Sequence, residues 1–168
     1  PPSEPAEQQA YGQDRQDEGH VSSLPAPSAC ERTDVPDLVV TRDEGVLRLH
    51  VDREPKRNAL NGEVLRGVRD ALRDVGDARV VLLTSAGERV FCSGADLVQM
   101  APDATGLEVH EGRGLLREVV LAMRACPVPV VASVQGLCLA GGVGLVLGCD
   151  LVIASENAVL GQTGAKVG

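Results

Sequence analysis

Two short loops in this sequence are built from small residues, and each follows an apolar run of strand length. The loop at Gly94–Asp96 comes after the run Val80–Thr84, and the loop at Ala140–Gly142 comes after the run Val130–Val134. Small residues let a ligand atom approach the backbone closely, and N–H groups at the start of a helix have no partner within it. Two such loops facing each other would place two N–H donors around one oxygen, which is the geometry of an oxyanion hole. The alternative is that these glycines only permit tight packing of helix on sheet.

Composition and spacing argue against several other kinds of site. Neither a GxxxxGK[ST] phosphate loop nor a GxGxxG motif followed by a suitably placed acid occurs. The three histidines and five cysteines have no metal-ligand spacing, so no metal site is expected. The odd number and irregular spacing of the cysteines do not suggest a disulfide framework, which favours a reduced, cytoplasmic protein. With a net charge of −8, 1% aromatic residues and no long apolar run, we expect neither nucleic acid nor a membrane as partner.

The first 36 residues differ in composition from the rest of the chain. They contain six of the ten prolines, and seven acidic residues against two basic ones. Such a segment cannot bury enough apolar surface to offset the entropy lost on ordering. We therefore expect residues 1–36 to be a disordered, acidic, proline-rich tail, and residues 37–168 to form one domain.

Apolar periodicity divides the remainder into strands and helices. Alternation predicts a hairpin over 38–51 with its turn at Glu44–Gly45, and helical spacing predicts a helix from Gly62 that stops before Gly76. The later expected elements are a strand at 80–84, a helical turn at 95–100, a helix at 107–125, a strand at 130–134, a buried helix at 143–148, and strands at 151–154 and 158–160. The continuous apolar runs predict strands covered on both faces. This order predicts an α/β fold of repeated strand–loop–helix units.

Four motifs in order carry a resemblance to a known family. They are Pro55–Asn61, Phe91–Leu97, Gln135–Gly136 with Ala140–Gly142, and Cys149–Ala154. Together they resemble the crotonase superfamily, which is the enoyl-CoA hydratase/isomerase family, over residues 37–168. The resemblance implies an α/β spiral of ββα units, truncated here before the C-terminal helices, in a fragment or a processed chain. It also implies a homotrimer or hexamer at full length and a role in fatty acid metabolism. A CoA thioester would be the substrate or ligand, with no cofactor, and its enolate would be stabilised.

The resemblance also implies roles for individual residues. The backbone N–H groups of Ala95 and Gly141 would form the oxyanion hole. The remaining residues expected to contact the acyl-CoA match the loop that crosses the CoA or the stretch that lines the adenine and pantetheine site: Lys56, Arg57, Ala59, Leu60, Asp96, Leu97 and Val98. Arg57 would meet a CoA phosphate, and Asp96 is expected to cap the helical turn that follows it.

The two positions at which the family carries catalytic glutamates are glycines here, at Gly144 and Gly164. Glycine supplies neither an acid nor a base, so ordinary hydration of an enoyl-CoA is not expected. One alternative is a structural remnant that folds only with a partner chain, which the early end of the sequence favours. Three further readings stay open. The first is a variant reaction of an acyl-CoA, such as isomerisation, decarboxylation or hydrolysis, and the second is a non-catalytic acyl-CoA binder or regulatory subunit. The third is ring closure like that of 1,4-dihydroxy-2-naphthoyl-CoA synthases, which the run Gly161–Gly168 resembles.

Overall fold

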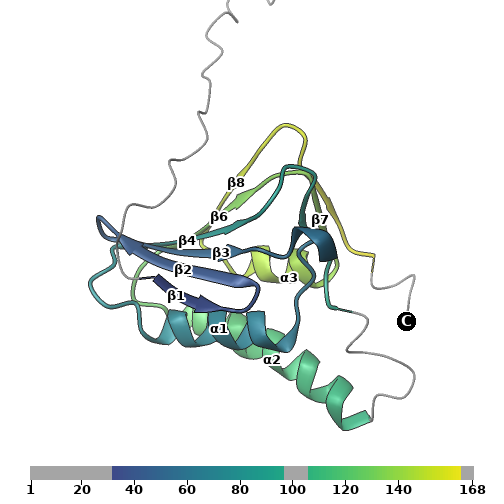
Figure 1. Ribbon diagram of the computed structural model, residues 1–168, viewed down its shortest axis with the longest axis horizontal. Helices are drawn as coiled ribbons and strands as arrows, with labels where there is room; N and C mark the ends of the chain where they lie inside the picture. Colours follow the sequence, from purple (N-terminus) through teal and green to yellow (C-terminus); the bar gives the residue numbers. More distant parts are fainter. Residues whose placement is uncertain (1–31, 97–105, 164–168) are drawn as a thin grey trace, which may run out of the picture.

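The computed structural model describes residues 32–96 and 106–163 of the 168-residue chain. Two successive strands followed by a helix recur along it (Figure 1). The elements are β1 (Arg32–Val35), β2 (Leu38–Asp43), β3 (Val46–Val51), the 3-10 turn η1 (Glu54–Lys56), α1 (Gly62–Arg73), β4 (Val80–Ser85), β5 (Val90–Cys92), α2 (Gly106–Ala125), β6 (Val130–Val134), β7 (Leu137–Leu139), α3 (Gly141–Leu147), β8 (Leu151–Ala154) and β9 (Val159–Gly161).

The strands form two sheets that alternate along the chain. The larger sheet has six strands in the order β1-β2-β3-β4-β6-β8, antiparallel from β1 to β3 and parallel from β3 to β8. The smaller sheet is parallel, in the order β5-β7-β9. Each strand of the smaller sheet directly follows one of the larger sheet. Helix α2 follows the pair β4 and β5, and helix α3 follows the pair β6 and β7. This is the α/β spiral of ββα units that the resemblance implied.

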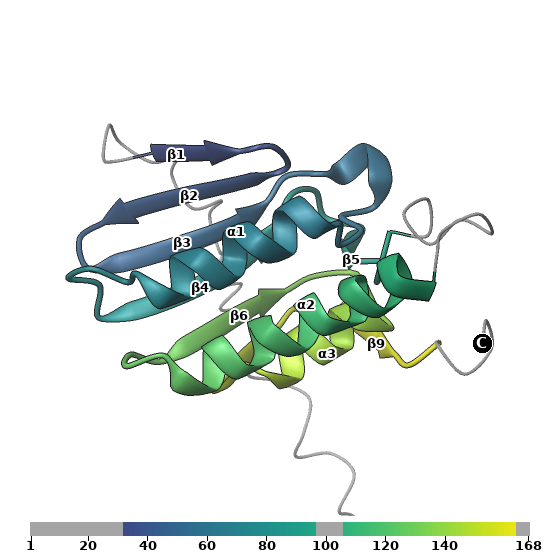
Figure 2. The ribbon, with the colours of Figure 1, turned by 90° about the horizontal axis from the view of Figure 1, so that it is seen from below.

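The hydrophobic core lies between the larger sheet and helices α1 and α2, which run side by side across one face of it (Figure 2). The side chain of Asn61 accepts a 2.8 Å hydrogen bond from the Val64 N–H and so begins α1. The core side chains with almost no exposed surface come from both layers: Leu38, Leu47, Leu49, Val64, Val68, Val81, Leu83, Val119 and Val130. Burying each of them contributes about 1.5–3 kcal/mol before entropic costs.

The other face of the larger sheet is not covered by any helix among the described residues. Burial alternates along β4 and along β6, so the expectation that these strands are covered on both faces is wrong. Every residue of β8, the edge strand, is exposed. Six large apolar side chains near this edge have between 44% and 76% of their surface exposed: Leu147, Leu151, Val152, Ile153, Val159 and Leu160. The apolar runs therefore mark strand positions correctly but overstate the cover on them.

Three further differences concern segments expected to be tail or loop. The strand β1 pairs with β2 over Arg32–Val35, so the boundary expected at residue 36 falls too late. An edge strand is held by backbone hydrogen bonds and needs no apolar pattern, which is why composition missed it. The strands β5 and β7, each of three residues, lie where loops were expected. Residues 1–31 and most of the turn expected at 95–100 lie outside the described parts of the chain. Within the described parts, no helix is long and apolar enough to span a bilayer.

We predict that Gly136→Ala lowers the free energy of unfolding by about 2–4 kcal/mol, from left-handed strain and overpacking. Gly136 has φ +59°, and an added Cβ would run into the backbone carbonyl of Arg89. The matched control is Gly114→Ala in α2, where an added Cβ meets nothing within 4 Å and helix propensity should add about 0.5–1 kcal/mol. Urea denaturation measures both; equal stability of the two variants would contradict this packing.

Candidate active site

The backbone N–H of Ala95 is aimed by a pairing between two loops. Leu60 donates its N–H to the Gly94 carbonyl at 2.8 Å, and Asp96 donates its N–H to the Leu60 carbonyl at 2.9 Å, which makes a parallel bridge between Leu60 and Ala95. Backbone groups alternate in direction along an extended chain. Because Gly94 and Asp96 both face Leu60, the N–H of Ala95 points away from it, and Ala95 is exposed. The first expected donor is therefore available to a ligand.

The second expected donor, the N–H of Gly141, stands at the start of α3. The first N–H groups of a helix have no partner within it. Among the described residues, the Ala140 carbonyl at the start of α3 accepts from Val143 and Gly144 and not from Gly141. Ala140 itself has φ 48° and ψ −113°, a conformation that costs a non-glycine residue about 1–3 kcal/mol. The hydrogen bond from the Ala140 N–H to the Gly161 carbonyl helps to hold this backbone in place, at 2.9 Å. The strained residue directly precedes the donor and so sets its direction.

The two donors border one space. A Cβ added to Gly141 would stand 3.5 Å from the Ala95 nitrogen, and a Cβ added to Gly94 would stand 3.4 Å from the Gly141 nitrogen. Gly94 has φ +105°, which favours glycine, and Gly142 packs so closely on Cys92 that an added Cβ would lie 2.7 Å from the cysteine Cβ. Gly94 and Gly142 thus permit close packing, which was the alternative explanation for the glycines of these loops. They also leave Ala95 and Gly141 side by side with room for a ligand atom.

The loop expected to cross the CoA lies against this segment. The Arg57 carbonyl accepts a hydrogen bond from the Ser93 N–H at 3.1 Å, next to the pairing made by Leu60. Lys56 and Arg57 are exposed and available to an anionic group. Ala59 and Leu60 are at most 8% exposed, so contact with a ligand would come from their backbone rather than from their side chains.

Some of the residues expected in the site lie outside the described parts of the chain. These are Leu97, Val98 and Gly164. Gly144 is described, and among the described residues outside its own helix backbone the only atom within 4 Å of an added Cβ is Cδ2 of Leu116, at 3.7 Å. A side chain at this position would therefore be tolerated, so packing does not require the glycine. The same Leu116 methyl lies 3.6 Å from a Cβ added to Gly141, which makes Leu116 of α2 a further neighbour of the site.

Sequence reasoning missed the polar residues that hold the two loops together. Asn58 is 1% exposed and donates to the carbonyls of Ala86 and Val90, both at 2.8 Å, while its side-chain oxygen accepts from the Arg53 N–H. Arg53 in turn forms an ion pair with Asp96 at 3.0 Å. Leu116 lies in the helix expected at 107–125, and the sequence does not distinguish it from the other apolar positions there. For these residues the sequence carries no signal beyond residue type, because their partners lie far along the chain.

The cysteines near the site are unsuited to nucleophilic catalysis. Burial raises the pKa of Cys92 to about 12 and the pKa of Cys138 to about 11, in each case as the largest cause. The Gly94 N–H, 3.4 Å from the Cys92 sulfur, lowers the pKa of that thiol but does not offset burial. Both thiols are therefore neutral at pH 7, and a neutral thiol is a poor nucleophile. Cys92 acts as a small packing residue beneath Gly142.

We predict that Cys92 reacts with iodoacetamide at pH 8 about a thousandfold more slowly in the folded protein than in the unfolded one. The thiolate is the reactive form, and burial raises the pKa of Cys92 from 9.0 to about 12. Peptide mass spectrometry after timed alkylation measures each cysteine separately. Cys126, which is only partly buried, is the internal comparison. Equal labelling of Cys92 with and without urea would contradict the described packing.

The fold agrees with comparisons to known proteins. Residues 41–168 match the family model of enoyl-CoA hydratase/isomerase, so the chain belongs to that family. It is 36% identical over 133 residues to a probable mitochondrial enoyl-CoA hydratase 2 of Arabidopsis thaliana, covering 74% of this chain and 43% of that protein. It is 35% identical over 138 residues to the putative enoyl-CoA hydratase/isomerase YngF of Bacillus subtilis, covering 77% of this chain and 52% of that protein.

Solved structures show the same fold. An enoyl-CoA hydratase from Mycobacterium smegmatis superimposes with a TM-score of 0.74 at 33% identity, covering 79% of this chain and 53% of that one. Human enoyl Coenzyme A hydratase domain-containing protein 3 superimposes with a TM-score of 0.74 at 29% identity, covering 78% and 53%. The chain therefore spans about half the length of the relatives it matches.

Proposed function

We propose that this protein binds an acyl-CoA thioester and stabilises the enolate of its acyl group. The observation that carries the proposal is that the Ala95 and Gly141 N–H groups border one space: a Cβ added to Gly141 would stand only 3.5 Å from the Ala95 nitrogen. Two preorganised backbone donors stabilise the charge that develops on a carbonyl oxygen when it becomes an enolate. Membership of the enoyl-CoA hydratase/isomerase family supports CoA thioesters as the ligand class.

In the proposed complex, the remaining contacts come from the loop beside Ala95. The exposed side chains of Lys56 and Arg57 would meet the CoA phosphates, and the backbone of Ala59 and Leu60 would lie along the pantetheine. Asp96, Leu97 and Val98 would continue the CoA-binding stretch. The reaction would be a variant one, because Gly144 supplies no acid or base. The lack of an acid or base at Gly144 equally favours the second candidate, a non-catalytic acyl-CoA binder. Ring closure like that of 1,4-dihydroxy-2-naphthoyl-CoA synthases stays a prediction.

Assembly and location stay predictions as well. The exposed apolar side chains of β8 and β9 support association with further polypeptide, in line with the expected homotrimer or hexamer. Relatives from Arabidopsis thaliana and mouse are named as mitochondrial, whereas we expected a cytoplasmic protein.

We predict that the native protein binds acyl-CoA and that Gly141→Val abolishes binding. Isothermal calorimetry with acetyl-, crotonyl- and long-chain acyl-CoA measures it. Valine should fit the fold, since a Cβ at this position has no neighbour closer than 3.5 Å, but it fills the space that the carbonyl oxygen needs. The matched control is Gly114→Val on α2, which stands two residues from Leu116 and so faces the opposite side of the helix. Absence of heat with the native protein, or equal loss in both variants, would refute the proposed site.

We further predict that the native protein hydrates crotonyl-CoA slowly or not at all. A general acid or base contributes about 10²–10⁴-fold, and both usual positions are glycine. Loss of enoyl-thioester absorbance measures the rate, with Gly144→Glu/Gly164→Glu run beside the native protein. A gain of activity in the double variant would support the conclusion that the native protein keeps the fold of the family but lacks its usual acid and base. Fast hydration by the native chain would show that other residues supply them.

A further inference from the structure

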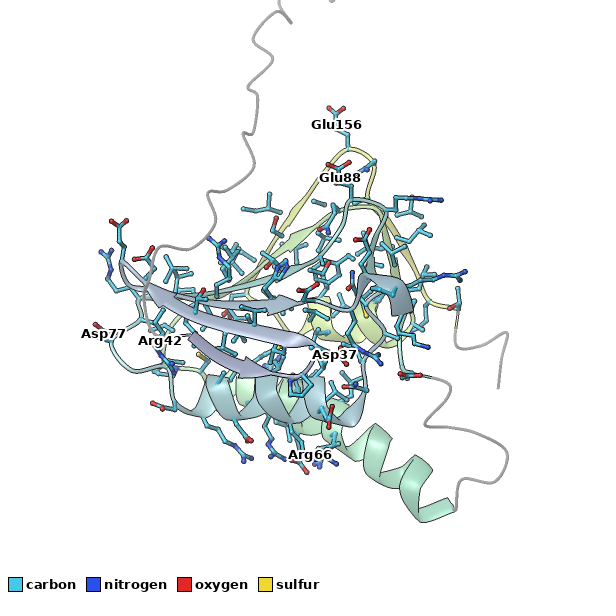
Figure 3. All side chains as sticks on the ribbon, viewed as in Figure 1. Asp37, Arg42, Arg66, Asp77, Glu88 and Glu156 are labelled. Atoms are coloured by element: carbon cyan, nitrogen blue, oxygen red, sulfur yellow. The ribbon has the colours of Figure 1, made fainter. Side chains whose placement is uncertain are left out.

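One arginine side chain contacts three separate segments at the edge of the proposed oxyanion hole. Arg53 follows β3, and only 10% of its side chain is exposed. Its Nε lies 2.6 Å from an Asp37 carboxylate oxygen, one terminal nitrogen lies 3.0 Å from an Asp96 carboxylate oxygen, and the other donates to the Ala59 carbonyl at 2.7 Å. Asp37 stands at the turn between β1 and β2, at the end of the larger sheet where β3 leads into this loop (Figure 3).

The contacts of Arg53 with Ala59 and Asp96 lie on either side of the backbone pairing between Leu60 and Ala95, which directs the Ala95 N–H. Ala59 directly precedes Leu60, and Asp96 directly follows Ala95, so one guanidinium holds a neighbour of each residue in the bridge. The segment needs such an anchor, because Gly94 on its other side has φ +105° and the conformational freedom of glycine. The Asp96 side chain is itself only 12% exposed, and loss of one partner from a pair this buried would leave the other charge buried without compensation.

We propose that Arg53 is a positioning residue for the oxyanion hole, and this inference rests on the proposed function. By holding Ala59 and Asp96 together, its guanidinium fixes the direction of the Ala95 N–H toward the thioester oxygen. The planar fork of arginine reaches all three acceptors at once, which the single ammonium of lysine cannot do. Arg53 touches no reacting atom in this arrangement. Its effect is on how well a bound carbonyl is polarised.

The test measures the carbonyl directly and needs no turnover. Butyryl-CoA labelled with carbon-13 at its carbonyl is bound to the full chain, and its stretching band is recorded by isotope-edited infrared spectroscopy. Hydrogen bonding to the oxygen moves this band to lower wavenumber. In the native protein we expect such a shift. In Arg53→Lys we expect binding of similar affinity, measured by calorimetry, with most of the shift lost. Asp96→Asn, which removes the charge of one partner, should also lose part of it.

The matched control is Arg69→Lys. Arg69 also binds two carboxylates, Asp70 and Glu118, each at 2.8 Å, and its side chain is 19% exposed, but it lies between α1 and α2. A purely structural loss would affect both arginine variants alike, whereas we expect the full carbonyl shift in Arg69→Lys. A full shift in Arg53→Lys, or a reduced shift in Arg69→Lys, would overturn the inference.

Other outcomes separate this inference from the proposed function. If the native protein binds no butyryl-CoA, or binds it without a carbonyl shift, the proposed oxyanion hole is wrong whatever Arg53 does. If Arg53→Lys and Asp96→Asn both lose cooperative thermal unfolding, the network serves the fold alone and the positioning role is refuted. Binding with a diminished shift, restricted to the Arg53 and Asp96 variants, is the result that supports it.

Discussion

The short backbone pairing between Leu60 and Ala95 determines where the first proposed oxyanion donor points. Two hydrogen bonds, at 2.8 and 2.9 Å, turn the groups of Gly94 and Asp96 toward Leu60 and leave the Ala95 N–H facing the other way. The two loops joined by this pairing come from different turns of the spiral. The larger sheet, the packing of α1 and the buried side chain of Asn58 all help to bring them together.

The structure provides more of what the proposed binding of a carbonyl needs than of what a reaction on it needs. Backbone donors need only a fixed main chain and small neighbours, and the strained conformation of Ala140 and the close contact between Gly142 and Cys92 provide both. Acid–base chemistry needs a side chain of suitable pKa. Gly144 has none, and the buried thiol of Cys92 stays protonated. The described residues therefore support the proposed polarisation of a thioester more strongly than any particular transformation of it.

Much of the fold could be predicted because its longer elements repeat a pattern. The β2–β3 hairpin, with its turn at Glu44 and Gly45, and helices α1 and α2 all follow apolar periodicity. The strands β5 and β7 could not be found this way, since three residues are too few for a period and pairing in the smaller sheet stabilises them. Burial of β4 was overestimated, because an apolar run does not reveal whether anything covers its second face.

The candidate site was only partly predictable for a related reason. The motifs around Ala95 and Gly141 stand out as runs of small residues, and the structure brings them together. The ion pairs of Arg53 do not stand out, because Asp37 and Asp96 lie far from it in the sequence and only the fold makes them neighbours.

In the proposed site, the Ala95 and Gly141 N–H groups together bind one thioester oxygen. Backbone amide NMR tests it most directly, with acetyl-CoA and with a thioether analogue of CoA that lacks the carbonyl. Hydrogen bonding to an oxygen moves an amide proton downfield. We expect downfield shifts of both amide protons with the thioester and neither shift with the thioether. Identical spectra with the two ligands, or a shift of only one of the two amides, would contradict it.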